Sequence, residues 1–463
     1  MNRAVPFVAA ILGAAALSLQ GNPRDVDTAA ATGSEADQPC KAAWARQIGP
    51  GWPGTSIFTV VAVAVDSAGN AYLTSSTGDR FGDRRFGKYD AFVVKYDPSG
   101  KRLWTQQFGT PADDESHGIA VDASGNIHVC GVTKGNLGGR SAGDWDGFLV
   151  KYDASGKLLW KQQLGTPAED WFNAVAVDSS GNVYVGGETE GSLAGTKDKP
   201  WGCDVILVKY DASGKLFWSR QIVTPGEISF CLSVAADSSG NVYITGETCG
   251  SIGGPNAGWY DAYLIKYDSS GTVLWKRQFG SDLDDCGCSV AVDDAGDPYV
   301  GGYTHAIHNG SHPEKKDAFL VKYDASGSQQ WYREIGTEKE EEGCCVAVDH
   351  SGNAYLGGWT YGSLGGTNAG DCDAFLVKYD DSGKVLWKRQ FGTTSYDKAF
   401  SVAIGPACSV YVAGETHGGL LGEPRSQGVG PDDFVVKFED PEKAPPERLP
   451  STGQKTAPGP KKH

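Results

Sequence analysis

The sequence predicts an all-β fold, a seven-bladed β-propeller with four antiparallel strands per blade. A stretch close to DAFLVKYDDSGKVLWKRQFG, at residues 373–392, recurs along the chain, and 56 to 59 residues separate the Asp residues that open successive copies. A fixed period of this kind is typical of repeat architectures. Each copy also contains four short segments rich in Val, Ile, Tyr, Phe or Trp, and no segment has the period of an amphipathic helix.

The copies keep one register from end to end. Their opening residues are Asp90, Asp146, Asp204, Asp261, Asp317, Asp373 and Asp432, and the Trp residues of their LWKRQFG-like segments are Trp44, Trp104, Trp160, Trp218, Trp275, Trp331 and Trp387. Trp44 has no DAFLVKYD segment before it, and the copy that opens at Asp432 has no LW segment after it. Because these two half-copies complete one another, we predict that an N-terminal strand completes the last blade and closes the ring.

The four strands of a blade are clear in the fourth copy, at residues 232–237, 242–248, 262–267 and 273–279. Across the repeats the first two strands carry mainly Ala, Val, Ser and Gly, whereas the last two carry Phe, Tyr, Trp and Leu. Sheets arranged around an axis are crowded near it and diverge outward. The first strand is therefore predicted to be innermost, and the Trp strand outermost.

Two short turns recur in each copy, as at Asp178–Asn182 and Asp211–Lys215. An Asp that accepts turn N–H groups, followed by a Gly free to adopt positive φ, favours a tight hairpin. The connections that vary instead precede the first strand or join the second strand to the third. Both variable sets lie at one end of the ring, and we expect any specific function there.

The combination of AVDSSGNVYVGGET, DAFLVKYD, SGK and LWKRQFG resembles the SBBP repeat family, seven-bladed β-propellers of exported bacterial proteins. The resemblance covers nearly the whole chain between its flanks. It implies the propeller fold and a secreted or cell-surface setting, and it implies no catalytic residues. The last copy departs from the pattern, because Gly405 replaces the Asp of the first turn.

The repeat limits and the composition of the flanks divide the chain into four regions. Residues 1–20 have the basic start, apolar run and small residues of a signal peptide. Residues 21–40 are expected to be a disordered leader, 41–440 the propeller, and 441–463 a disordered Pro-rich tail. The LPSTG at 449–453 resembles a sorting signal but lacks the following hydrophobic stretch, so we interpret it as coincidental.

The chain has a formal net charge of −16 over 463 residues. This charge argues against nucleic acid as a partner, since phosphate binding needs a basic face. After loss of the signal peptide we expect a monomer without an integral membrane segment, secreted or held at the cell surface or in the periplasm. Its expected partner is a protein or a polysaccharide.

Acidic residues gather in the loops before the first strands. The candidate acidic rim consists of Asp113, Asp114, Glu169, Asp170, Asp284, Asp285, Glu340 and Glu341. Around one mouth of the ring these residues would attract Ca²⁺ or a cationic partner. The alternative is a set of solvated acidic loops, and none of them has the ligand spacing of an EF-hand. We expect no cofactor, with Ca²⁺ as the one alternative.

A histidine-rich loop in the fifth blade contains His305, His308 and His312. Three imidazoles this close could bind Zn²⁺ or Cu²⁺, although no HExxH motif or helix holds them. A plain polar surface loop is the alternative interpretation.

The 11 cysteines do not follow the repeat. Cys231 and Cys249 flank one hairpin almost symmetrically, and we predict a disulfide between them, with free thiols as the alternative. A bridge between the Cys286/Cys288 and Cys344/Cys345 pairs on adjacent blades is a second hypothesis. A reactive cysteine is not expected, because the loops of these cysteines supply no basic neighbour.

These observations lead to three functional hypotheses. The first is an exported binding or scaffold module whose ligand lies on the acidic loop face. The second is a lyase- or hydrolase-type enzyme with its site on the same face, although no nucleophile or phosphate-binding motif appears in its required context. The third is a structural component of the cell envelope.

Overall fold

A computed structural model describes residues 40–49, 61–78, 80–81, 85–193, 202–224, 227–305, 315–425 and 430–440. The regions expected to form the signal peptide and the tail lie outside the described residues, and so does the leader up to residue 39.

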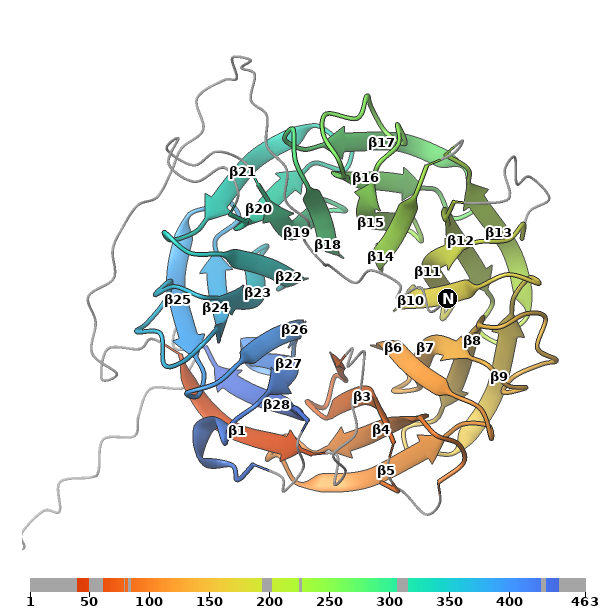
Figure 1. The fold of residues 1–463 in the computed structure, drawn as a ribbon, viewed down its shortest axis with the longest axis horizontal. Helices are drawn as coiled ribbons and strands as arrows, with labels where there is room; N and C mark the ends of the chain where they lie inside the picture. The colour runs from red at the N-terminus through yellow and green to blue at the C-terminus, as the bar shows by residue number, and fades with distance from the viewer. Residues whose placement is uncertain are drawn as a thin grey trace, which may run out of the picture.

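Seven four-stranded antiparallel sheets stand around a common axis as blades (Figure 1), which confirms the predicted fold. The innermost strands are β2 (Ala62–Val65), β6 (Asp114–Val121), β10 (Asp170–Val177), β14 (Ser229–Ala236), β18 (Asp285–Val292), β22 (Glu341–Val348) and β26 (Asp397–Ile404). The second strands are β3 (Ala71–Thr77), β7 (Ile127–Thr133), β11 (Val183–Thr189), β15 (Val242–Thr248), β19 (Pro298–Thr304), β23 (Ala354–Thr360) and β27 (Val410–Thr416).

The outer half of each blade is formed by the repeated DAFLVKYD and LWKRQFG segments. The third strands are β4 (Asp90–Tyr96), β8 (Asp146–Tyr152), β12 (Asp204–Tyr210), β16 (Asp261–Tyr267), β20 (Asp317–Tyr323), β24 (Asp373–Tyr379) and β28 (Asp432–Glu439). The outermost strands are β5 (Arg102–Phe108), β9 (Leu158–Leu164), β13 (Leu216–Ile222), β17 (Val273–Phe279), β21 (Gln329–Ile335), β25 (Val385–Phe391) and β1 (Lys41–Ile48). The only described helices are two 3₁₀ turns in the seventh blade, η2 (Pro406–Cys408) and η3 (Leu420–Gly422).

The seventh blade joins the two ends of the ring. Its strand order is β1-β28-β27-β26, so the N-terminal β1 is the outermost strand of a sheet whose other strands are C-terminal. β1 pairs with β28 in antiparallel register, with Trp44 opposite Lys437. The predicted closure by an N-terminal strand is therefore confirmed.

The repeated turns have the predicted geometry. In the turn after β10, Asp178 accepts hydrogen bonds from the backbone N–H groups of Ser180 and Asn182, both at 2.9 Å, and Gly181 has φ +78°. The seventh blade lacks this turn geometry, as the replacement of the turn Asp by Gly405 indicates. Gly405 opens the 3₁₀ turn η2, in which Ala407 and Cys408 adopt positive φ without being glycine.

Apolar clusters fill the spaces between blades. A fully buried Tyr on the second strand packs against the Trp of the outermost strand in the same blade, as for Tyr243 and Trp275, whose ring centroids are 6.2 Å apart. In the second blade His128 replaces the Tyr and packs against Trp160. The large residues therefore occupy the outer part of the space between blades, which is wide enough for them.

Candidate functional site

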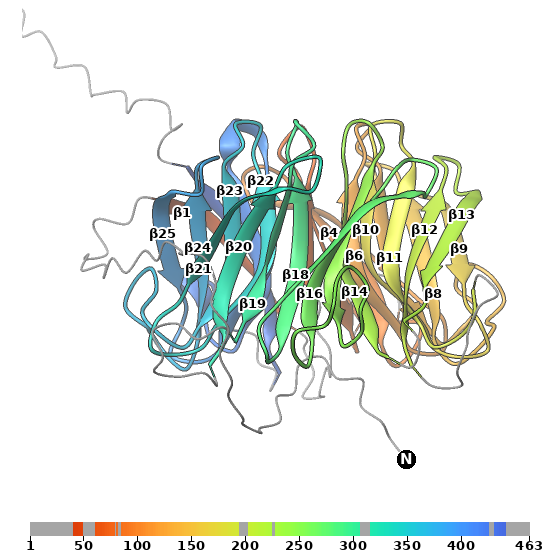
Figure 2. The ribbon, with the colours of Figure 1, turned by 90° about the horizontal axis from the view of Figure 1, so that it is seen from above.

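The two ends of the ring differ in how many of their residues make contacts between blades. We call the end with the repeated Asp-x-x-Gly turns the turn face, and the end where the innermost strands begin the loop face. Figure 2 shows the ring from the side, with these two ends at opposite edges. Contacts between blades occupy the turn face, whereas the loop face holds the residues that vary from blade to blade.

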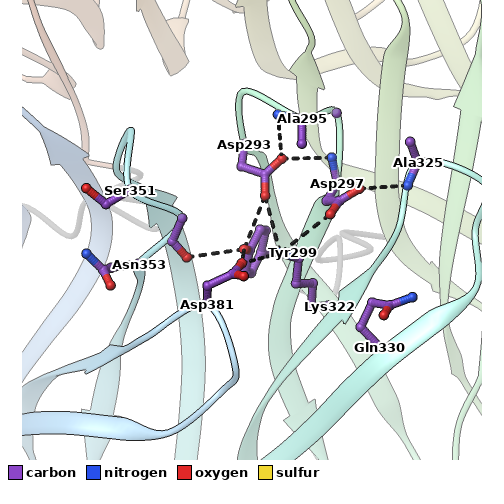
Figure 3. Close-up of polar contacts among 12 residues, drawn as sticks. Asp293, Ala295, Asp297, Tyr299, Lys322, Ala325, Gln330, Ser351, Asn353 and Asp381 are labelled. Carbon is purple, nitrogen blue, oxygen red and sulfur yellow. Dashed lines mark hydrogen bonds and ion pairs between the residues drawn. The ribbon is translucent and has the colours of Figure 1, made fainter.

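On the turn face a lysine from the third strand reaches the turn of the next blade. Figure 3 shows one such contact, in which the Lys322 ammonium lies 3.4 Å from Asp293 and 3.5 Å from Asp297 and also bonds Asp381 of the following blade. The hydroxyl of Tyr299 lies 3.1 Å from the same Asp381 carboxylate. In other blades the equivalent lysine donates to a turn carbonyl of the next blade, as Lys95 does to Ala154 and Lys209 to Ser269. These lysines therefore serve the assembly of the ring.

Half of the predicted acidic rim is buried. Asp114, Asp170, Asp285 and Glu341 each begin an innermost strand, and each is at most 2% exposed. Asp170 accepts hydrogen bonds from Thr166 N (2.5 Å), Thr166 Oγ1 (2.9 Å) and Thr189 Oγ1 (2.5 Å). Burial raises the pKa of Asp285 to about 6 and that of Glu341 to about 7. These buried carboxyls are hydrogen-bonded within the fold and fix the start of the innermost strand.

The other half of the predicted rim lies at the surface. Asp113, Glu169 and Asp284 are partly exposed and Glu340 is exposed, and the backbone carbonyl of each accepts a hydrogen bond from the loop beside it. Their side chains remain on the loop face. Burial, followed by the nearby charge of Glu190, raises the pKa of Glu169.

The histidine loop is described only in part. His305 Nδ1 lies 2.7 Å from the backbone carbonyl of Asp284, whereas His308 and His312 lie outside the described residues. Within the described residues no group of His, Cys, Asp or Glu side chains is arranged to hold a metal ion.

The expected Cys231–Cys249 disulfide is not formed, and both residues are free thiols. The strand register gives the reason, since Cys231 lies opposite Gly246 while the Cys249 backbone N–H bonds the carbonyl of Ile228. The hairpin is centred on Ser239, since Ala236 pairs with Val242, and the β-bulge after Cys231 shifts the pairing by one more residue, so the symmetric spacing about Gly240 does not bring the two sulfurs together.

Tryptophans outside the repeat register are the residues that the acidic-rim prediction overlooked. The described ones are Trp145, Trp171, Trp259 and Trp359. Each lies at the loop-face end of a strand or in the loop before one, and Trp259 is 54% exposed. Tyr396, in the loop that leads into β26, is 40% exposed on the same face. The sequence contained this signal, because these rings break the repeat while the framework Trp residues follow it.

The second and third blades bring several of these rings together. His117 stacks on Trp171 with ring centroids 5.7 Å apart and an angle of 10° between the planes, and Trp145 lies 5.6 Å from the same Trp171. Lys134 lies over the Trp145 ring at 4.7 Å. We call His117, Trp145 and Trp171 the tryptophan cluster. Both indoles are partly exposed.

Carboxylates surround the tryptophan cluster. Glu115 Oε2 lies 4.0 Å from His117 Nε2, Asp144 pairs with Lys134 at 3.3 Å, and Glu169 hydrogen-bonds Trp171. Flat apolar faces bordered by charged acceptors suit a ligand that has both apolar surface and hydrogen-bond donors. This combination makes the loop face of the second and third blades the candidate binding site.

Across the part of the chain that the structure covers, no helix is long and apolar enough to cross a membrane.

A family model described as SBBP, beta-propeller repeat, matches residues 43–82, 103–138, 159–194 and 218–253. The regulatory protein FlaEY of Caulobacter vibrioides is 28% identical over 203 residues, which cover 39% of this chain and 21% of FlaEY. The uncharacterized WD repeat-containing protein L264 of Acanthamoeba polyphaga mimivirus is 21% identical over 457 residues, covering 74% of this chain and 32% of L264. The chain thus spans less than two thirds of the length of either relative.

Among solved structures, BamB from Moraxella catarrhalis is similar with a TM-score of 0.42 and 12% identity, covering 86% of this chain and 99% of BamB.

Proposed function

Because this chain belongs to the SBBP β-propeller repeat family, we propose that it is an exported binding module whose loop face holds a polysaccharide. The observation that supports this proposal is the placement of the aromatic residues outside the repeat register. Trp145, Trp171 and Trp259 all belong to the loop face, together with the carboxylates of Asp113, Glu169 and others.

A sugar ring has apolar C–H faces and a rim of hydroxyl donors. Partly exposed indoles offer flat apolar surfaces to the former, and the carboxylates beside them accept hydrogen bonds from the latter. Trp145 and Trp171 are already packed against each other and against His117, so little side-chain entropy is lost when a ligand binds. A protein ligand would use the same aromatic anchors, and it is the second outcome that the test distinguishes.

The setting of this activity is also part of the proposal. Residues 1–20 have the composition of a signal peptide, and we place the module outside the cytoplasm on that basis. Cell fractionation with N-terminal sequencing of the mature protein tests this placement. A protein that keeps Met1 and stays in the cytoplasm would contradict it.

The binding proposal is tested on arrays of bacterial polysaccharides and candidate proteins, followed by calorimetric titration of the best ligand. Trp145→Ala and Trp171→Ala are expected to weaken binding about tenfold or more, the loss typical of an aromatic anchor. Phe217→Ala is the matched control, because Phe217 is 67% exposed but lies on the outermost strand β13.

The outcomes separate the alternatives clearly. Polysaccharide binding that the loop-face variants weaken and the Phe217 variant keeps supports the proposal, provided that all variants retain the melting temperature. If only a protein binds to this face, the ligand is a protein and the proposed polysaccharide is wrong. Binding that none of the loop-face variants changes would move the site elsewhere.

A further inference from the structure

Three cysteines meet where the fifth and sixth blades face each other. Cys286 and Cys288 lie on β18, and Cys344 lies on β22, the neighbouring innermost strand (Figure 1). Cys288 Sγ is 3.5 Å from Cys286 Sγ, and the Cys288 side chain also hydrogen-bonds that of Cys344. The hydrogen bond from Val346 N to Ser289 Oγ, 3.1 Å long, holds the two strands together beside the thiols.

β-Bulges place two of these thiols outside the regular strand pairing. In β18 the pairing shifts between Cys286 and Ser289, which leaves Cys288 without a cross-strand partner. In β22 the shift between Gly343 and Cys345 does the same for Cys344. A bulge re-aims the side chain of the extra residue.

The residue at the bulge differs from blade to blade. The equivalent positions in the other described innermost strands are occupied by His117, Asn173, Leu232 and Phe400. The framework of the repeat therefore does not demand cysteine here.

The surroundings favour a thiolate on Cys288. Hydrogen bonds from the Cys286 and Cys344 thiols, together with the positive charge of Lys316, hold the pKa of Cys288 below its usual range. Burial, with the neighbouring Cys288 charge, raises the pKa values of Cys286 and Cys344. Lys316 itself pairs with Glu342 at 2.8 Å, across the same boundary between blades.

Access distinguishes Cys288 and Cys344 from Cys286. Cys288 and Cys344 are partly exposed, whereas Cys286 is buried. The described residues contain no group arranged to hold a metal ion, so the three thiols do not form a metal site. A partly exposed thiolate with a second thiol in hydrogen-bond contact is the arrangement that thiol–disulfide exchange requires.

We propose that Cys288 and Cys344 form a redox-sensitive site that a low-molecular-weight disulfide converts to a disulfide across the fifth and sixth blades. The Cys288 thiolate attacks one sulfur of the reagent, which forms a mixed disulfide and releases the other half as a thiolate. Cys344 then passes its proton to the thiolate released in the first step and attacks Cys288 Sγ, which forms the protein disulfide and releases the second half of the reagent as a thiolate. Two cysteines are oxidised, and the reagent is reduced to two thiols.

Cys344 is the resolving residue because of its access. Cys286 lies two residues before Cys288 beside the bulge, with its sulfur 3.5 Å from that of Cys288, but it is buried, whereas Cys344 is partly exposed. A mixed disulfide on Cys288 that extends toward solvent is therefore open to Cys344. Cys344 approaches from a separate strand, and the bulges leave both residues free of ladder pairing. Cys286 serves as the hydrogen-bond partner of the thiolate.

The first test measures reactivity in the unmodified full chain. Iodoacetamide labelling at pH 7, followed residue by residue with mass spectrometry, is expected to modify Cys288 about tenfold faster than Cys249. Cys249 is the internal control, because it is also partly exposed but burial raises its pKa. Equal rates at the two residues would overturn the proposal.

The second test identifies the bond. After incubation with oxidised glutathione, tryptic peptides 278–315 and 340–378 are expected to be linked through Cys288 and Cys344. Cys344→Ser should trap glutathione on Cys288, and Cys288→Ser should abolish the link. A bond from Cys288 to Cys286, or a link that survives Cys288→Ser, would refute the mechanism. The first test uses no variant, so it holds even if a substitution impairs folding.

Discussion

Buried carboxyl groups are the most unusual residues of this ring. Glu188 is 5% exposed and accepts a 2.6 Å hydrogen bond from Asn173 Nδ2. Burial raises the pKa of Glu188 to about 8, that of Asp433 to about 8 and that of Glu247 to about 7. A carboxyl whose folded-state pKa is raised binds its proton more tightly in the folded protein than in the unfolded chain.

These carboxyls determine whether the free energy of unfolding rises or falls with pH. The contribution of Glu188 to stability is fully present below the pKa of 4.5 that a glutamate has in the unfolded chain, and it is lost as the pH rises toward about 8. We expect the free energy of unfolding to fall between pH 5 and pH 8.5, and Glu188→Gln to reduce this fall by about 2–4 kcal/mol. Urea denaturation of both proteins at pH 5 and pH 8.5 measures this fall in the free energy of unfolding.

The exposed neighbour Glu190 provides the control for this prediction. Glu190→Gln removes the same charge without removing a buried carboxyl, so the fall should match that of the unmodified protein. An identical pH dependence in the Glu188 and Glu190 variants would show that the buried group does not govern it.

At the scale of the strand, the repeated outer hairpin fills the wide outer part of its blade and also contacts the next blade. The indole N–H of Trp331, on β21, donates to the Asp381 carbonyl of the sixth blade at 2.9 Å, and Arg333 Nε donates to the Gly383 carbonyl at 2.9 Å. The equivalent indoles that bond the following blade are Trp44, Trp104, Trp218 and Trp275. The Trp, Arg and turn Gly of the motif therefore meet across several of the boundaries, although Gln106 and Gln162 take the place of the Arg in the first two blades.

A comparison of two glycines distinguishes the free-energy cost of backbone strain from the cost of losing the indole contact. Gly383 and Gly181 both have φ +78°, but a Cβ on Gly383 would lie 2.7 Å from the Trp331 ring, whereas a Cβ on Gly181 would lie 3.4 Å from Ala212 Cβ. Substitution of either glycine by Ala costs about 1–2 kcal/mol in the left-handed region. Gly383→Ala should cost about 1–3 kcal/mol more because it displaces the indole.

Chemical denaturation of the two alanine variants measures this difference. Removing the indole as well, in a Trp331→Ala, Gly383→Ala double variant, should eliminate the excess cost of the glycine substitution. Equal destabilisation by Gly383→Ala and Gly181→Ala would mean that the indole contact contributes nothing beyond the turn strain.

At the scale of the whole molecule, one strand holds the ring closed. β1 pairs with β28, and Gln47 on β1 donates to Asp432 at 2.6 Å and to the Gly418 carbonyl at 2.8 Å. Trp44 and Arg46 then reach the first blade, where they donate to the carbonyls of Pro98 and Gly100. β1 therefore completes the last blade and also joins it to the first.

Deleting residues 42–49 should sharply lower the melting temperature, because it exposes the β28 edge and breaks the contacts to the first blade. Calorimetry measures the change. A synthetic peptide of residues 40–49 should raise the melting temperature of the truncated protein progressively as the peptide concentration increases, because it binds only the folded ring. An unchanged transition after the deletion would contradict closure by β1.

The sequence alone determined the ring, the order of strands within a blade, the turn geometry and the closing strand, because each follows from a pattern that repeats within one short unit. It could also indicate the tryptophans of the loop face, since they depart from that pattern. The tertiary structure decided what depends on contacts between blades. It buried Asp170 among threonines, kept Cys231 away from Cys249, and brought Lys316 and Cys344 to Cys288. Contacts between distant segments depend on bulges and blade packing, which a linear spacing does not contain.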